Sequence, residues 1–262
     1  MFICFDGNFL KPKENSLVSP FLNATMFGYS VFETLRTYDS TQIFCKETHL
    51  DRLFKSADIL KLTLPIDRKE LSKNLDILVE KNQQIKQDLR IKIFCCEDFY
   101  WIRTQLLDEI PTDFYTKGIE VCDQVFERSF PKAKYANPAY PFFLKIQPKH
   151  CFETIFFNET GFLREGNISN IFVVLDKKIV TSKQNILSGI TREKVLETSR
   201  ILNIKTEERE ITREEVSSSD ALFLTNTTKE IVPIRKWGNW EKQDFEIAHL
   251  LRKHFPKGNT DK

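Results

Sequence analysis

The sequence predicts an α+β protein with two domains, residues 1–115 and 116–262. Segments with helical periodicity and segments with strand periodicity both occur, without the regular β-α-β alternation of a doubly wound sheet. A chain of 262 residues is long enough for one large or two small domains. The stretch from Asp108 to Asp113 shows neither periodicity. We therefore expect a linker there and a domain boundary near residues 110–120.

The N-terminal half predicts two helices and a strand. Thr48–Leu62 carries one apolar stripe and has Thr48 in position to act as its N-cap. Arg68–Lys81 repeats the helical pattern, and Arg90–Cys96 is typical of a strand. We expect a small α+β domain from these segments.

The C-terminal half predicts mainly strands. The expected strands are Ile119–Phe126, Glu153–Phe157, Asn170–Leu175, Lys178–Thr181, Ala221–Thr225 and Ile231–Ile234, and the expected helices are Thr191–Asn203 and Glu241–Phe255. Four prolines fall between Phe130 and Pro148. Because proline lacks an N–H and clashes with the preceding turn, a long regular helix is not expected there.

Composition excludes several classes of protein. The 39 Lys and Arg residues nearly balance the 37 Asp and Glu residues, so charge gives no indication of a nucleic-acid partner. No apolar run approaches the roughly 18 residues of a membrane span, and Met1–Asp6 lacks the basic start of a signal peptide. The six cysteines include no C-x-x-C pair and the four histidines are scattered. We expect a cytoplasmic protein with reduced thiols and no metal site.

Four clusters of polar residues follow one another along the chain. They are F-E-T-L-R at Phe32–Arg36 with H-L-D-R-L at His49–Leu53; K-Y-A-N at Lys134–Asn137; E-G-N-I-S-N at Glu165–Asn170 with S-G-I-T-R at Ser188–Arg192; and N-T-T-K-E-I-V-P at Asn226–Pro233. Their order resembles the class IV aminotransferases, the pyridoxal-phosphate enzymes of fold type IV. That family includes branched-chain and D-amino acid aminotransferases and 4-amino-4-deoxychorismate lyases.

The resemblance extends from about Phe5 to Pro233, nearly the whole chain. It implies a larger C-terminal pseudo-barrel domain, a pyridoxal 5'-phosphate cofactor between the two domains, and a homodimer.

The cofactor phosphate needs cationic and N–H partners. Gly189 and Ile190 open a predicted helix, whose free N–H groups suit a phosphate. Arg52 lies on a helix but off its apolar stripe, and a guanidinium binds phosphate in bidentate fashion. The resemblance assigns the phosphate to Arg52, Thr227, Thr228 and the Gly189–Ile190 backbone. From the residues alone, a solvated helix face is the favoured interpretation of Arg52.

The resemblance also assigns the two chemical ends of the cofactor. Lys134 would form the Schiff base, because it alone of the nearby lysines is followed by the Asn of K-x-x-N; Lys132 is the alternative. Glu165 would keep the pyridine nitrogen protonated, which makes the ring an electron sink. A plain turn carboxylate is the alternative for Glu165. Pro138 and Pro141 depart from the family pattern, since relatives continue into a helix after the lysine.

The substrate side rests on the F-E-T-L-R strand and the following one. The resemblance places Phe32, Thr34 and Arg36 beside the pocket and Lys92 near a substrate carboxylate; cations that face solvent or a structural acid are the alternative. The resemblance implies an aminotransferase acting on an amino acid and a 2-oxo acid. The first alternative is 4-amino-4-deoxychorismate lyase, favoured by Thr34 where branched-chain enzymes tend to have Gly. The second is a non-catalytic protein that binds pyridoxal phosphate.

Overall fold

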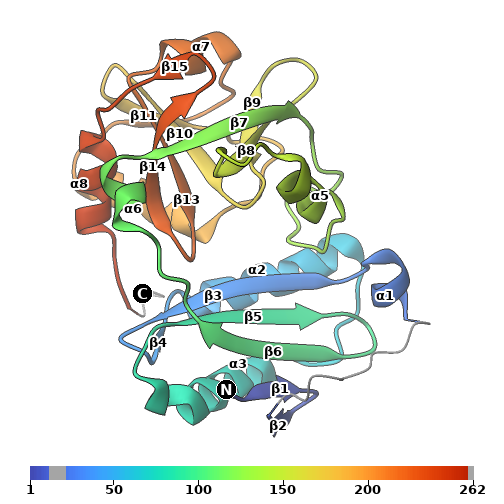
Figure 1. Ribbon diagram of the computed structural model, residues 1–262. Coiled ribbons are helices and arrows are strands. Elements are labelled where there is room, and N and C mark those ends of the chain that lie inside the picture. Colours follow the sequence, from blue (N-terminus) through green and yellow to red (C-terminus); the bar gives the residue numbers. More distant parts are fainter. Residues whose placement is uncertain (12–21, 259–262) are drawn as a thin grey trace. The chain divides into compact units, whose positions relative to one another are not determined.

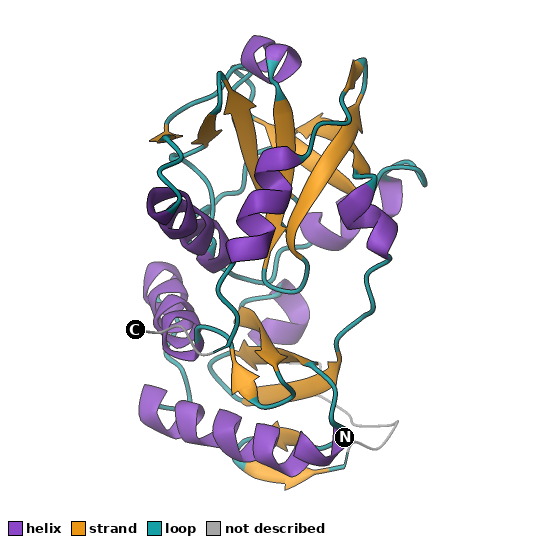
Figure 2. Ribbon diagram, turned by 90° about the vertical axis from the view of Figure 1, so that its left-hand side faces the viewer, coloured by secondary structure: helices purple, strands orange, loops and turns teal. Residues whose placement is uncertain are grey.

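The computed structural model describes residues 1–11 and 22–258, which form two compact units (Figures 1 and 2). The first unit comprises Met1–Asp108, the short segment Ala133–Asn137 and the C-terminal residues from Lys257. The second comprises Glu109–Lys132 and Pro138–Pro256. Both units combine helices with mainly antiparallel sheets, which confirms the α+β prediction.

The first unit contains a six-stranded antiparallel sheet with strand order β2-β1-β6-β5-β3-β4. Its elements are β1 Ile3–Phe5, β2 Asn8–Leu10, α1 Asn23–Phe27, β3 Val31–Tyr38, β4 Gln42–Ile43, α2 Lys46–Leu60, α3 Arg68–Asn82, the 3₁₀ turn η1 Gln83–Ile85, β5 Leu89–Cys95 and β6 Tyr100–Leu106.

One face of this sheet is covered by α2 and α3. Alternate residues of β3 and β5, such as Leu35 and Ile91, pack with Leu53 of α2 and Leu75 of α3 in one core. The other face then carries Phe32, Thr34 and Arg36 and their cross-strand neighbours, because successive strand residues point to opposite sides. The sheet therefore has a core side and a side on which polar and aromatic residues gather.

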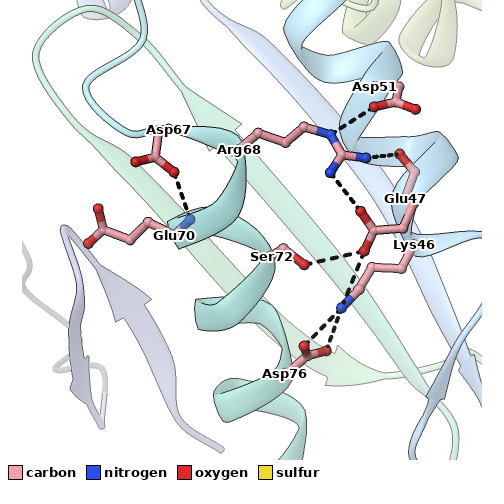
Figure 3. Close-up of polar contacts among 8 residues, drawn as sticks. All are labelled: Lys46, Glu47, Asp51, Asp67, Arg68, Glu70, Ser72 and Asp76. Atoms are coloured by element: carbon pink, nitrogen blue, oxygen red, sulfur yellow. Dashed lines mark hydrogen bonds and ion pairs between the residues drawn. The ribbon is translucent and has the colours of Figure 1, made fainter.

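Ion pairs connect the exposed edges of α2 and α3 (Figure 3). Arg68 of α3 contacts both Glu47 and Asp51 of α2, and Lys46 contacts Asp76 at 2.8 Å. Helix α2 begins at Lys46, so Thr48 lies inside the helix and the expected N-cap is wrong. Cys45 precedes the helix in the left-handed region, and this turn from β4 sets the start of α2.

The second unit contains a curled sheet with strand order β12-β11-β10-β13-β14-β7-β8-β9, and β15 pairs with β14. Its elements are α4 Thr112–Thr116, β7 Ile119–Val125, α5 Ala139–Ile146, β8 Glu153–Phe157, β9 Leu163–Gly166, β10 Asn170–Leu175, β11 Lys178–Thr181, α6 Ile190–Ile201, β12 Thr206–Glu208, α7 Arg213–Ser218, β13 Ala221–Asn226, β14 Glu230–Trp237, β15 Trp240–Glu241 and α8 Glu246–His254.

The curl of this sheet follows from which strands touch. The end strand β9 contacts β10 although four strands separate them in the pairing order, so the sheet bends around its core. The core is filled by aliphatic side chains such as Ile155, Val173 and Ile234, with Trp237 at one end. Helix α6 packs on β13 and α8 packs on β14 (Figure 1). This agrees with the expected pseudo-barrel.

Three strands were predicted residue for residue, and their turns explain why. Glu153–Phe157, Asn170–Leu175 and Lys178–Thr181 have the predicted bounds. The two-residue turn Asp176-Lys177 has positive φ at both positions, which matches the twist of an antiparallel hairpin.

The proline-rich segment contains an α-helix, so the expectation that Pro138 and Pro141 obstruct one is wrong. Helix α5 runs over Ala139–Ile146 with Pro138 as its N-cap. Pro141 is the third helical residue, where the backbone N–H has no partner within the helix in any case. Proline is therefore tolerated in this first turn. The last helix, α8, is also shorter at its start than Glu241–Phe255 predicted. None of the helices in the described ranges is long and apolar enough to cross a membrane.

Candidate active site

Lys134 lies on the edge of β3 in the first unit. The backbone N–H of Phe32 donates to the carbonyl of Lys134 at 3.1 Å, and Val31 bridges Tyr135 in antiparallel fashion. On the other side, the Lys134 N–H donates to Ser56 Oγ of α2 at 3.0 Å. The Lys134 ammonium lies 4.8 Å from the centroid of the Phe32 ring. The peptide of the proposed Schiff-base lysine is thus held by both a strand and a helix.

Arg52 of α2 faces a buried carboxylate. Its Nε and Nη2 donate to the two oxygens of Glu33 at 2.7 and 2.8 Å, a bidentate pair. The Arg52 side chain is only 11% exposed and that of Glu33 is fully buried, so the solvated-face interpretation of Arg52 does not hold. His49 Nδ1, one turn earlier on α2, lies 2.8 Å from Glu33 Oε2.

The protonation states of Glu33 and His49 follow from their burial and from the neighbouring Arg52. Burial alone would raise the pKa of Glu33, but Arg52 and His49 hold that pKa well below its ordinary value. Burial lowers the pKa of His49 despite the neighbouring carboxylate. His49 is thus neutral and donates through Nδ1, while Glu33 stays ionised and fixes the direction of the Arg52 guanidinium.

The predicted substrate residues share the open face of the first sheet. Thr34 pairs across the strands with Lys92, and Lys92 pairs with Arg103. Phe32 pairs with Phe94 in the next row. Burial, together with the nearby arginines Arg90 and Arg103, lowers the pKa of Lys92. No hydrogen bond or ion pair joins Lys92 to another of the described residues, which distinguishes it from most buried cations here.

Arg36 has a different environment from Lys92. Its Nη2 contacts Asp88 at 3.1 Å, and its guanidinium lies 4.1 Å from the centroid of the Tyr38 ring. The side chain is 9% exposed. The structural-acid alternative therefore describes Arg36, whereas Lys92 keeps the features of a substrate cation.

Glu165 is the second-last residue of β9 in the second unit, and its buried carboxylate accepts several hydrogen bonds. Oε1 accepts from Nε of Arg128 at 3.0 Å. Oε2 accepts from the Leu187 N–H at 3.0 Å and from Asn170 Nδ2 at 3.3 Å. A solvent-facing turn carboxylate would lack this set of donors. The carboxylate is held from two sides in a fixed orientation.

Asn170 joins Glu165 to the start of α6. Its Nδ2 also donates to the Leu187 carbonyl at 3.0 Å. A Cβ at Gly189 would overlap the Asn170 amide oxygen, so this position requires glycine. Gly189 is the N-cap of α6, and Ile190 is the first helical residue. The Oγ1 of the next residue, Thr191, is buried and makes no hydrogen bond with any described residue.

The predicted phosphate residues Thr227 and Thr228 lie in the tight turn between β13 and β14. Asn226 pairs with Glu230 across the turn. The Asn226 amide oxygen accepts from the Lys229 N–H at 2.9 Å and from Thr228 Oγ1 at 3.2 Å. This turn therefore has a defined backbone path, set by one asparagine.

Residues 30–237 match the family model described as amino-transferase class IV, which spans most of the chain. The chain belongs to the class IV aminotransferases. Members of this family are enzymes.

Relatives of this class IV aminotransferase carry the names of both aminotransferases and a lyase. It is 30% identical over 265 residues to the "Probable branched-chain-amino-acid aminotransferase" of Thermotoga maritima, covering 97% of this chain and 95% of the relative. It is 24% identical over 277 residues to the "Aminodeoxychorismate lyase" of Bacillus subtilis, covering 97% and 94%. A crystal structure from Thermotoga maritima, described as a "putative branched-chain amino acid aminotransferase", has a TM-score of 0.86, 29% identity and coverage of 97% and 94%.

Several contact residues of this class IV aminotransferase did not stand out in the sequence. Glu33 and Asn170 belong to recognised motifs, but the motifs do not show that Glu33 pairs with Arg52 or that Asn170 pairs with Glu165. Arg128 lies outside every motif, and only its cation six positions before Lys134 could have suggested it. Each needs the fold to show what it contacts.

Proposed function

We propose that this protein transfers an amino group between an amino acid and a 2-oxo acid, with pyridoxal 5'-phosphate as cofactor and Lys134 as the residue that binds it covalently. The observation that carries the proposal is the fixed peptide of Lys134, hydrogen bonded to β3 through its carbonyl and to Ser56 through its N–H. The name of the Thermotoga maritima relative makes branched-chain amino acids the first donors to test.

The residues present fit this cofactor. Lys134 offers an amine for the aldehyde, and Arg52 offers a guanidinium fixed by Glu33. The start of α6 offers free N–H groups and the unpaired Oγ1 of Thr191, which suit a phosphate. Glu165 offers a buried carboxylate for the pyridine nitrogen. When bound, pyridoxal phosphate acts as an electron sink that stabilises negative charge on the substrate α-carbon.

Each residue then has a specific task. Lys134 would hold the cofactor through its amine and, in the reaction, would move the substrate α-proton as a general base. Glu165 holds a proton at the pyridine nitrogen. Arg52, Thr227, Thr228 and the N–H groups of Gly189 and Ile190 bind the phosphate. Lys92 binds a substrate carboxylate, beside Phe32 and Thr34, while Arg36 supports the same strand through Asp88.

Borohydride labelling tests the lysine directly. Reduction of the protein with bound cofactor should attach the cofactor to one tryptic peptide, the one that contains Lys134. Label on Lys132 would move the attachment point by two residues, and label on Lys145 or Lys149 would show that the assignment through the proline segment is wrong. Absence of both label and visible absorbance would remove the cofactor from the proposal.

A second candidate is 4-amino-4-deoxychorismate lyase, which Thr34 favours. Thr34 is partly exposed on the open sheet face and pairs with Lys92. Its hydroxyl could hydrogen bond to the departing group of a lyase substrate, whereas a glycine could not. The Bacillus subtilis relative carries the name of this lyase.

Thr34→Gly separates the two reactions. In a lyase it should lower 4-aminobenzoate release by about 10²-fold, the scale of a lost hydrogen-bonding or acid–base group. In an aminotransferase neither form should release 4-aminobenzoate, and the substitution should mainly change substrate preference. Robust 4-aminobenzoate release with negligible oxo-acid turnover by the unmodified protein would make the lyase the correct function. Cofactor binding without turnover of either kind would indicate a non-catalytic protein.

We further propose a cytoplasmic homodimer. Helix α5 leaves Phe142, Leu144 and Ile146 between 45% and 54% exposed, an apolar surface that a second copy could cover. Sedimentation should give twice the mass of the chain. A monomer at micromolar concentration would contradict this assignment.

A further inference from the structure

Glu153 is a fully buried carboxylate next to the Glu165–Asn170 segment in the second unit. It is the first residue of β8. Its Oε1 accepts from the Ile168 N–H at 2.7 Å, and its Oε2 accepts from Ser169 Oγ at 2.8 Å. These bonds hold the loop that directly follows Glu165, the carboxylate proposed for the pyridine nitrogen.

The hydrogen bonds continue from this loop to the turn between β13 and β14. Ser169 Oγ accepts from Asn226 Nδ2 at 2.9 Å. Asn226 in turn fixes Thr228 Oγ1 and the Lys229 N–H through its amide oxygen. A continuous chain of hydrogen bonds therefore runs from Glu153 through Ser169 and Asn226 to the turn that contains Thr227 and Thr228.

This carboxylate has a high energetic cost for its position. Its hydrogen-bond donors include the Ile168 N–H and the Ser169 hydroxyl. No guanidinium or imidazole of the described residues forms a hydrogen bond with it, and the charge of Lys229 only partly offsets the cost of its burial. A Cβ at Gly166 would overlap Glu153 Oε1, so position 166 must be glycine for the Glu153 carboxylate to fit. An amide or an apolar residue would be cheaper to bury. We therefore attribute the carboxylate to its role in holding the loop in position and not to a gain in folding stability.

We propose that Glu153 is a positioning residue that holds the Glu165 loop and the Thr227–Thr228 turn in one arrangement, so that the nitrogen side and the phosphate side of the cofactor are bound together. The inference rests on the proposed function, because it assumes that both segments contact pyridoxal phosphate. Ser169 is the connecting residue. Its neighbour Asn170 contacts Glu165 and Leu187, so the two adjacent residues secure the loop in different directions.

The test compares binding of pyridoxal phosphate with binding of pyridoxal, which lacks the phosphate. Three variants are measured beside the parent protein: Glu153→Gln, Ser169→Ala and Ser219→Ala. Ser219 is the matched control, since it is a fully buried serine of the same unit whose Oγ donates only to the Val216 carbonyl. Dissociation constants come from fluorescence titration. The pH titration of the bound cofactor's visible band reports the surroundings of its ring.

We expect Glu153→Gln and Ser169→Ala to lower the affinity for pyridoxal phosphate by about tenfold, the effect of losing one buried hydrogen bond. The affinity for pyridoxal should fall less, so the ratio of the two affinities should drop. The pH midpoint of the visible band should shift in both variants. Ser219→Ala should change neither the ratio nor the midpoint, even if its melting temperature falls.

Three results would overturn the inference. Folded Ser169→Ala with an unchanged affinity ratio and an unchanged pH midpoint would show that the Glu153–Ser169–Asn226 hydrogen bonds do not affect cofactor binding. This conclusion would hold even if Glu153→Gln fails to fold. An equal fall in the affinities for pyridoxal phosphate and for pyridoxal would show that Glu153 positions only the Glu165 loop and has no effect on the phosphate side. The same changes in Ser219→Ala would reduce the effect to general destabilisation. If the parent protein binds neither compound, the proposed function itself fails, which is a separate and recognisable outcome.

Discussion

Each unit contains one fully buried glutamate behind its proposed cofactor residues, and the two differ in their partners. Glu33 faces the Arg52 guanidinium and the His49 imidazole, which together keep its pKa well below the ordinary value. Burial raises the pKa of Glu153 to about 6, and the hydrogen bonds from Ile168 and Ser169 only partly oppose this. At equal burial, the charge of the partner decides whether the pKa of the carboxylate falls or rises.

The largest expected effect is on stability, from Glu33→Gln. The substitution removes the counter-charge of a guanidinium that is only 11% exposed, which typically costs about 3–5 kcal/mol of unfolding free energy. Glu153→Gln should cost much less at neutral pH, because it removes a charge that has no charged partner within hydrogen-bond distance. Urea unfolding of both variants measures the difference.

Asp51→Asn is the control for this comparison. Asp51 pairs with Arg68 on the exposed edge of α2 (Figure 3), where an ion pair contributes about 0.2–1 kcal/mol. Equal losses in Glu33→Gln and Glu153→Gln would show that the identity of the partner does not distinguish the two sites.

Arg52→Ala tests the same pair from the other side. It should weaken binding of pyridoxal phosphate by about 1.5–3 kcal/mol, the scale of a charge-assisted hydrogen bond. The position of Arg52 off the apolar stripe suggests little effect on folding, but the bidentate bond to Glu33 reverses that expectation. Unfolding free energy and cofactor affinity should therefore both fall. Arg68→Ala, from an exposed ion pair, should leave the affinity unchanged.

The sequence predicts the elements of this protein better than its contacts. The strands of the second unit follow from alternation and from turns such as Asp176-Lys177, which are local signals. The number of prolines alone does not predict the helix at Ala139–Ile146, because a proline obstructs a helix only beyond its first turn and Pro141 lies within that turn.

For the candidate site as well, the sequence identifies residues but does not show which of them are in contact. The motifs indicate Lys134, Arg52 and Glu165, because those residues lie in recognisable local patterns. They do not indicate that the Lys134 segment pairs with β3, since this contact joins residues about a hundred positions apart. The Glu153–Ser169 bond also depends on a register between strands that no single segment encodes.

The last prediction is a pH dependence of stability that isolates Glu153. Its pKa is about 6 in the folded protein against 4.5 as the ordinary value, so folding favours the protonated form. The stability that this group contributes is complete below about pH 4.5 and is lost as the pH rises through about 6. The loss is about 2 kcal/mol, from about 1.4 kcal/mol for each unit of pKa difference.

The unfolding free energy of the parent protein should therefore fall by about 2 kcal/mol relative to Glu153→Gln between pH 4.5 and pH 7. All other titrating groups are common to both proteins and cancel in the difference. Glu33 has the opposite sign, because its lowered pKa contributes stability above its ordinary value and loses it as the pH falls. Repeating the comparison with Glu33→Gln below about pH 4.5 should give a slope of the opposite sign. A flat difference for Glu153→Gln would mean that Glu153 is as well compensated as Glu33, and the contrast between the two buried carboxylates would disappear.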